Sequence, residues 1–208
     1  MNSSTREGAL FVVSAPSGAG KTSLCRELID RFADLRQSVS FTTRQARIGE
    51  ADGVDYHFIE STVFQQMVED KQLAEWAEVH GNSYGTSLDT LNTAAGQGVD
   101  LLLDIDFQGA AQLKKNYQQG VFIFILPPDF VELEKRLRGR GTDTDEVIKK
   151  RLKNAEREIS EAGWYDYLVI NDDFQTALDE MSAIVTAERC RSQRNKPILA
   201  ELTIKGEN

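Results

Sequence analysis

The sequence has few of the residues from which metal sites and histidine-dependent enzymes are built. Its 208 residues include two cysteines, Cys25 and Cys190, and two histidines, His57 and His80. The cysteines lie far apart and make no metal-binding spacing, so we expect no structural disulfide, as in a reducing compartment. The histidines show neither a Ser/His/Asp arrangement nor a zinc pattern. Zinc binding and histidine catalysis are therefore poor interpretations.

The sequence also lacks an excess of basic residues and any long apolar run. Lysine and arginine number 24 against 33 aspartates and glutamates, for a formal net charge of −9. This balance argues against nucleic acid or an anionic membrane as a partner, because both bind net basic surfaces. No apolar run approaches membrane-spanning length, and residues 1–8 are polar. We expect one soluble, cytoplasmic domain, for which an apolar fraction of 40% is ordinary.

A small-residue loop follows the first apolar run, residues 9–13, and precedes a helical pattern. Its residues are Ser14, Ala15, Pro16, Ser17, Gly18, Ala19, Gly20, Lys21 and Thr22. Glycines allow the sharp turns that point main-chain N–H groups at phosphate oxygens, and the helix start adds its positive dipole end. The pattern places Lys21 on the β- and γ-phosphates and the Thr22 hydroxyl on Mg²⁺. Ala15 departs from the general pattern, which has glycine there; a glycine-rich turn with a chance lysine is the plain alternative.

Apolar strands alternate with helices along much of the chain. Strands are expected at residues 9–13, 99–106, 121–126 and 167–170, and helices from Lys21 to about Leu35, over 108–117 and from Phe174 to about Arg194. Such alternation is typical of an α/β protein with a mostly parallel sheet flanked by helices, whose ligands lie at the carboxyl ends of the strands. We therefore expect a P-loop NTPase-type core, formed by residues 1–37, 96–126 and 160–208.

Two segments interrupt this core. Residues 38–95 show short alternating pieces and one helical pattern near residues 61–70 that Ser61 could cap, which predicts a small mixed α/β insertion. Residues 127–159 are rich in lysine and arginine, and the run Gly139, Arg140, Gly141 divides two helices. Asp143 with Glu146 makes a plausible cap for the second helix. Two helices joined through glycines predict a mobile lid.

The first insertion carries side chains suited to a nucleotide acceptor. Arg44 and Arg47, with hydroxyls just upstream, suit a dianionic phosphate, because guanidinium groups bond its oxygens in pairs. Glu75 with the Thr86 hydroxyl could face the adjacent N–H and NH₂ donors that guanine presents and adenine does not. Each feature alone has a simpler interpretation, as a solvated basic turn or an ordinary surface charge.

Several motifs together resemble one enzyme family. They are residues 15–22, the run Thr42-Thr43-Arg44-Gln45-Ala46-Arg47-Ile48-Gly49-Glu50, the run Gly81-Asn82-Ser83-Tyr84-Gly85-Thr86, residues 103–109, the run Arg138-Gly139-Arg140-Gly141, and residues 169–173. In order from about Leu10 to Arg189, the chain is similar to bacterial guanylate kinases. The resemblance implies transfer of a phosphoryl group from ATP to GMP, with Mg²⁺, on a core with a GMP-binding region over 38–95 and a lid over 127–159.

The resemblance also implies roles for individual residues. It assigns the GMP phosphate to Ser40, Arg44, Arg47, Tyr56 and Tyr84, and the guanine to Glu75, Thr86 and Asp106. It places Lys21 and Thr22 on the ATP phosphates and Mg²⁺. It assigns the catalytic arginines Arg136, Arg140 and Arg151, with Lys21, to the transferred phosphoryl group, and Asn171 to the adenine. No general base is needed, because the attacking phosphate oxygen is already an anion.

Two other functions remain open from the residues. A kinase of the same build could phosphorylate another nucleoside monophosphate or a phosphorylated ribose. Guanylate-kinase-like domains also occur as non-catalytic binding modules, which would be expected to lack Lys21 or the lid arginines. A homo-oligomer is possible, and residues 188–208 could form an interface helix or a frayed end.

Overall fold

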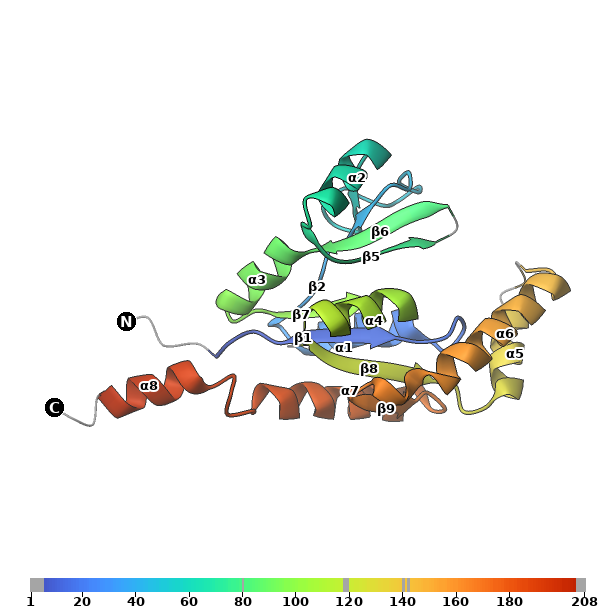
Figure 1. Ribbon diagram of the computed structural model, residues 1–208. Helices are drawn as coiled ribbons and strands as arrows, with labels where there is room; N and C mark the ends of the chain where they lie inside the picture. The colour runs from blue at the N-terminus through green and yellow to red at the C-terminus, as the bar shows by residue number, and fades with distance from the viewer. Residues whose placement is uncertain (1–5, 80, 118–119, 140, 142, 205–208) are drawn as a thin grey trace.

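A five-stranded parallel sheet forms the centre of the computed structural model, which describes residues 6–79, 81–117, 120–139, 141 and 143–204 (Figure 1). Its strand order is β2-β7-β1-β8-β9. The strands are β1 (Leu10–Ser14), β2 (Leu35–Gln37), β7 (Asp100–Asp104), β8 (Gly120–Leu126) and β9 (Tyr167–Ile170). Because β1 lies between β7 and β8, the segments that follow these three strands meet at one edge of the sheet. The predicted α/β class and parallel core are confirmed.

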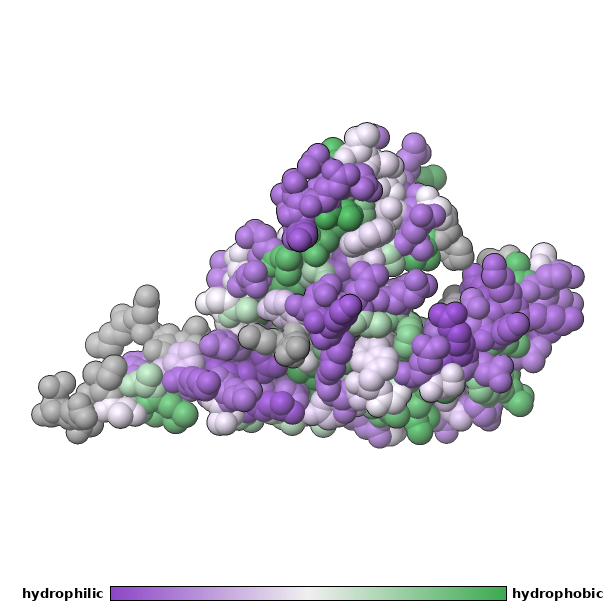
Figure 2. Space-filling view, in the orientation of Figure 1, coloured by the Kyte–Doolittle hydropathy of each residue, from purple (hydrophilic) through white to green (hydrophobic). Residues whose placement is uncertain are grey.

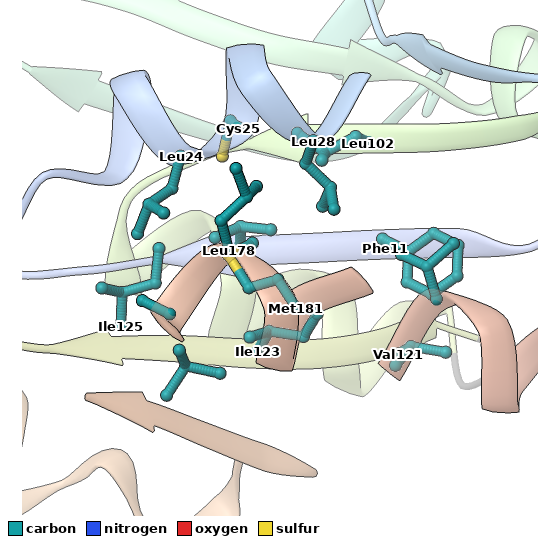
Figure 3. Packing of buried hydrophobic residues seen from close by; sticks show 14 of the residues in the cluster. Phe11, Leu24, Cys25, Leu28, Leu102, Val121, Ile123, Ile125, Leu178 and Met181 are labelled. Atoms are coloured by element: carbon teal, nitrogen blue, oxygen red, sulfur yellow. The ribbon is translucent and has the colours of Figure 1, made fainter. Parts of the chain in front are cut away.

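Helices cover both faces of this sheet. On one face, α1 (Lys21–Arg31) and α7 (Phe174–Arg189) pack their apolar sides on the strands around Phe11, Leu102 and Ile123, as Figure 3 shows. On the other face lie α3 (Leu88–Gly96), α4 (Phe107–Asn116) and the short 3₁₀ helix η1 (Ala162–Trp164). The three inner strands, β1, β7 and β8, are buried from both sides, which explains their continuous apolar sequences.

A second sheet has four strands in the order β4-β3-β6-β5 (Figure 1). It comprises β3 (Phe41–Thr42), β4 (His57–Phe58), β5 (Leu73–Val79) and β6 (Asn82–Ser87), and α2 (Ser61–Glu69) accompanies it. β3 pairs with β4 in parallel, whereas β6 runs antiparallel to both β3 and β5. The expected mixed α/β insertion is present, but β5, β6 and α3 had not been predicted as elements.

A pair of helices, α5 (Phe130–Gly139) and α6 (Asp145–Ser160), forms an arm beside the loop over residues 14–22, called the phosphate loop below (Figure 1). The arm has its own apolar cluster, formed by Leu133, Leu137, Ile148, Ala155 and Leu152. A Cβ on Gly18 would lie 3.0 Å from Leu137 Cδ2 and 3.1 Å from Leu133 Cδ1. α5 therefore packs directly on the phosphate loop. Arg140, predicted between the helices, lies outside the described residues.

Several predicted element ends are wrong. The first helix stops at Arg31, and Leu35 begins β2 instead. The cap of α2 is Glu60, without a side-chain hydrogen bond, and not Ser61. The cap of α6 is Thr144, whose hydroxyl accepts from the Val147 N–H, whereas Asp143 lies 3.4 Å from Arg151 in an ion pair.

The carboxyl-terminal helix and one central strand are also shorter than predicted. The Asn195 amide donates to the main-chain carbonyls of Arg189 and Arg191 at 2.9 Å, which satisfies carbonyls at the end of α7. A separate helix, α8 (Lys196–Ile204), follows. The strand predicted over 99–106 ends at Asp104, because Asp106 caps α4 by accepting from the Gly109 N–H at 2.8 Å.

One buried carboxylate joins distant parts of the core. Asp100, fully buried at the start of β7, accepts from Arg6 Nη1 and Nη2 at 2.6 and 2.7 Å and from Arg189 Nε at 2.6 Å. It also accepts from the Ala9 N–H at 2.7 Å. The charge is therefore paired and hydrogen-bonded, as a buried carboxylate requires.

Both thiols are free: Cys25 is buried in the core and Cys190 is exposed. In the part of the chain that the structure describes, no helix has the length and apolar composition needed to cross a membrane.

Candidate active site

The phosphate loop adopts a conformation that only glycine allows at two positions. It connects β1 to α1, and Gly18 and Gly20 have φ angles of 98° and 92°. A Cβ on Gly20 would also lie 2.3 Å from the Asn171 amide nitrogen. That amide donates to the Ala19 carbonyl at 2.7 Å. Asn171 thus holds the main chain of the loop at Ala19. Its predicted contact with adenine remains a prediction.

Lys21 begins α1 and points toward the end of β7. Its ammonium lies 2.5 Å from the Asp104 carboxylate and donates to the Ile105 carbonyl at 2.9 Å. An ammonium has three donors, so one remains for a phosphate oxygen. The next residue, Thr22, has an exposed side chain at the start of the same helix. The strand, loop and helix follow one another as the sequence predicted, and Asp104, which the sequence predicts at the same end of the sheet, is the ion-pair partner of Lys21.

A cavity of about 550 Å³ opens over this loop. The loop residues line it together with Asp106, Phe107 and Gln108 at the start of α4, and with Asn154 and Glu158 from α6. Burial, and secondarily the nearby Asp106, raises the pKa of Glu158 above its usual value, and Lys21 opposes this effect. Asn154 and Glu158 were missed by sequence reasoning, and only their spacing with Arg151 on one face of α6 would have indicated them.

A second cavity, of about 250 Å³, lies between the small sheet and the end of β7. The residues predicted to bind GMP line it, with the exception of Thr86; they are Ser40, Arg44, Arg47, Tyr56, Glu75, Tyr84 and Asp106. Thr86 is fully buried behind Glu75. The structure thus brings together side chains from the loop over 43–50, both sheets and the start of α4.

Glu75 forms the inner end of this second cavity. Its side chain is buried, and Thr86 Oγ1 donates to Glu75 Oε1 at 2.6 Å. The Thr86 hydroxyl lies 3.5 Å from Ser40 Oγ. Burial raises the pKa of Glu75 to about 7, the Thr86 hydrogen bond lowers it, and the nearby Asp106 adds to the rise. A carboxyl with a pKa near neutrality inside a cavity is a candidate for a functional group.

Arg44, Tyr56 and Tyr84 lie at the outer end of the same cavity. The Tyr56 and Tyr84 rings meet edge to face, with centroids 5.9 Å apart, and the Arg44 guanidinium lies 5.5 Å from the Tyr56 centroid. Arg44 also forms a two-pronged ion pair with Glu50, at 3.0 and 2.8 Å. Arg47 is exposed at the cavity rim. Glu50 was part of a motif in the sequence but was given no role.

The arginines of the arm lie in different places. Arg151 Nη1 donates to Ser17 Oγ at 3.1 Å, so it reaches the phosphate loop. Arg136 donates through Nε to Glu132 at 3.0 Å and through Nη1 to the Asn171 carbonyl at 3.0 Å. Both arginines were predicted to surround the transferred phosphoryl group. In the structure Arg151 lies at the phosphate loop and Arg136 lies beside the end of β9.

The two cavities adjoin, because Val79 and Asp106 line both. The space-filling view shows the surface hollowed between the lobe of the small sheet and the arm of α5 and α6 (Figure 2). A glycine-rich phosphate loop thus faces an arginine- and tyrosine-lined cavity across a short distance. This arrangement, on a parallel sheet, defines the class of P-loop kinases that act on small phosphorylated acceptors.

Comparison with known proteins identifies the family. A profile of the guanylate kinase family matches residues 7–188. A guanylate kinase from Syntrophotalea carbinolica is 64% identical over 91% of this chain and 90% of its own, and one from Geobacter metallireducens is 57% identical over 91% and 93%. The crystal structure of guanylate kinase from Anaplasma phagocytophilum superposes with a TM-score of 0.72 at 34% identity, covering 91% of this chain and 90% of the other. The chain belongs to the guanylate kinase family, which is a family of enzymes.

Proposed function

We propose that the chain transfers the γ-phosphoryl group of ATP to GMP in the cleft formed by the two adjoining cavities. Family membership carries the reaction and its two substrates. The observation that supports this location is the pair of residues, Val79 and Asp106, common to both cavities. A donor on the loop and an acceptor in the second cavity would have their phosphates next to each other.

We assign the loop cavity to ATP and the second cavity to GMP. The main-chain N–H groups of residues 15–22, with Lys21, would bind the ATP phosphates. Arg44, Arg47, Tyr56 and Tyr84, with Ser40, would bind the GMP phosphate. Glu75 and Asp106 would accept from the guanine N–H donors, and Thr86 would hold Glu75 in place through its 2.6 Å hydrogen bond.

For phosphoryl transfer the protein has to align the two phosphates and neutralise the charge on the transferred group. The attacking phosphate oxygen is already an anion, so no residue has to remove a proton. Lys21 and the arginines of the arm, Arg151 among them, would supply positive charge, which acts most strongly once water is excluded. Movement of the arm over residues 127–159, and of the region over 38–95, would bring these groups together and limit hydrolysis of ATP by water.

The loop also fits a magnesium ion. In kinase sites Mg²⁺ usually takes one or two protein ligands along with phosphate oxygens and waters. The exposed Thr22 hydroxyl beside Lys21 would provide such a ligand. The ion would neutralise charge on the β- and γ-phosphates. We place the enzyme in the cytoplasm, where its nucleotide substrates occur, and leave its oligomeric state open.

A coupled assay of ADP release tests the function. Turnover would be measured with GMP, AMP, CMP, UMP and a ribose bisphosphate at equal concentrations. We expect GMP to be favoured over AMP by about a hundredfold or more, because the buried acceptor groups would be left unpaired by adenine. Equal rates with AMP and GMP would contradict the proposal, and absence of ATP binding in calorimetry would favour a non-catalytic module.

A further inference from the structure

The loop over residues 43–50 is held in shape by one carboxylate. Glu50 Oε1 accepts from Arg44 Nη2 at 2.8 Å, and Oε2 accepts from Arg44 Nη1 at 3.0 Å. Oε2 also accepts from the main-chain N–H of Arg47 at 2.7 Å, and the Glu50 N–H donates to the Arg47 carbonyl at 3.1 Å. Glu50 thus connects the two arginines that we assign to the GMP phosphate.

The ion pair with Glu50 determines which edge of the Arg44 guanidinium is left to bind a phosphate. Glu50 occupies the fork formed by Nη1 and Nη2, and the Gln45 carbonyl accepts from Nη1 at 2.7 Å. The Nε–H and the second Nη2 hydrogen lie on the other edge. Besides Glu50 and the Gln45 carbonyl, Arg44 also hydrogen-bonds the Tyr84 side chain, which lines the same cavity. The two N–H groups of this other edge can bond two oxygens of one phosphate.

Aromatic rings fix the plane of the same guanidinium. Its Cζ lies 5.5 Å from the Tyr56 centroid and 5.8 Å from the Phe58 centroid. The Arg44 and Glu50 side chains are 14% and 20% exposed, so water competes only partly for the ion pair. Hydrogen bonding from Arg44 holds the pKa of Glu50 below its usual value, so the carboxylate stays ionised at neutral pH. The ion pair and the rings therefore leave the guanidinium one orientation.

We propose that Glu50 is a positioning residue for the acceptor phosphate: it turns the Nε edge of Arg44 toward the cavity, on the side of Tyr84, and holds the main chain of Arg47 beside it. The inference rests on the proposed function, because the cavity must receive a nucleoside monophosphate. Glu50 does not itself face the phosphate as a ligand, since both carboxylate oxygens are taken by the loop. Preorganising Arg44 in this way removes an ordering cost from GMP binding.

The substitution Glu50→Gln tests the inference by calorimetry with two probes, GMP and guanosine. The amide keeps the shape but loses one acceptor and the charge that hold Arg44. We expect the Kd for GMP to rise about tenfold, since a charge-assisted pair is replaced by a weaker neutral one. The Kd for guanosine, which lacks the phosphate, is expected to stay within about twofold. In steady-state assays KM for GMP should rise more than kcat falls.

Two comparisons keep the test decisive. Asp55→Asn is the matched control, because the exposed Asp55 carboxylate accepts from the Ala51 N–H at 2.8 Å, just after the loop, without contacting either arginine. It should leave the GMP affinity unchanged. In an Arg44→Lys background, Glu50→Gln should raise the Kd for GMP by less than about a further twofold, because the guanidinium that Glu50 positions is absent.

Three outcomes would overturn the inference. Unchanged GMP affinity in Glu50→Gln, with normal binding by the wild type, would remove the role. An equal loss for GMP and guanosine would mean that Glu50 serves only the loop's fold, and so would a full further loss in the Arg44→Lys background. Absence of GMP binding by the wild-type chain would instead overturn the proposed function, and this inference with it.

Discussion

The two cavities of the cleft are built from different parts of the polypeptide. The loop cavity is lined by a main-chain turn, shaped by Gly18 and Gly20 and supported by the Asn171 amide, and by residues of α4 and α6. The second cavity consists of side chains, from Ser40 to Asp106, that reach in from several elements. Main-chain donors recognise any triphosphate, whereas side chains can distinguish one base from another. Under the proposed function, the first cavity would supply reactivity and the second would supply specificity.

Lys21→Ala should have the largest effect of the substitutions considered, on kcat far more than on GMP binding. We expect kcat to fall by about a thousandfold or more, because a preorganised charge at the transferred phosphate is lost. The Kd for GMP should change much less than kcat, since only the ion-pair partner of Lys21, Asp104, lines the second cavity. Single-turnover assays and GMP calorimetry would measure the two quantities.

Lys114→Ala is the control for that experiment. Lys114 also pairs with an aspartate, Asp166 at 2.9 Å, but lies away from both cavities of the cleft. Its turnover should match that of the wild type. Near-normal turnover in Lys21→Ala would contradict the assignment of the loop.

Glu75→Gln should reduce specificity while sparing the loop. An amide offers guanine one acceptor and turns an NH₂ toward its donors, so buried donors would be left unpaired. We expect kcat/KM for GMP to fall about a hundredfold and the preference over AMP to shrink with it. The comparison is a steady-state assay with both nucleotides.

Glu69→Gln is the matched control, since Glu69 is exposed on α2 and its carboxylate only accepts from Gln65 at 3.1 Å. It should behave as the wild type. If Glu75→Gln kept its preference for GMP, the guanine would have to be recognised elsewhere.

The pH dependence of guanosine binding should show a smaller effect of the same side chain. The pKa of Glu75 is about 7, raised mainly by burial, and guanine needs the ionised form as an acceptor. The affinity for guanosine should therefore be constant well above pH 7 and fall by about tenfold per unit below it. Guanosine is used because the GMP phosphate itself titrates near pH 6.

The stability of the free protein should respond to the same group in the opposite sense. The ordinary pKa of 4.5 is raised to about 7 on folding, so the folded chain binds more protons between these values. The free energy of unfolding should therefore decrease as pH rises through this window. Both slopes should be reduced in Glu75→Gln. A flat guanosine profile in the wild type would contradict the raised pKa.

The sequence predicted the strands and loop around the first cavity better than the strands around the second one. Strands such as β8 are continuous apolar runs, and the glycine and lysine positions of the loop are local in sequence. β5 was missed because the register shifts between Leu73 and Glu75, so that Ala74 and Glu75 are both buried and the alternation is lost. No periodic signal marks such a strand.

Partners distant in sequence could not be predicted for a similar reason. Lys21 meets Asp104 only because β1 and β7 are neighbours in the sheet. Glu50 and Arg44 lie six residues apart in an irregular loop, where spacing carries no information about contact. The residue types at the site could be read from the sequence, but their pairing depends on strand order and loop shape.

The buried Asp100 sets limits on where the chain can be shortened. Arg6, near the start, and Arg189, at the end of α7, hold the same carboxylate. Removing either end past its arginine would leave a fully buried charge short of partners, which costs about 3 to 5 kcal/mol when a buried pair is broken. Fusion partners and affinity tags are therefore best joined outside these two arginines. Removing residues after 195 would leave both ion pairs with Asp100 intact.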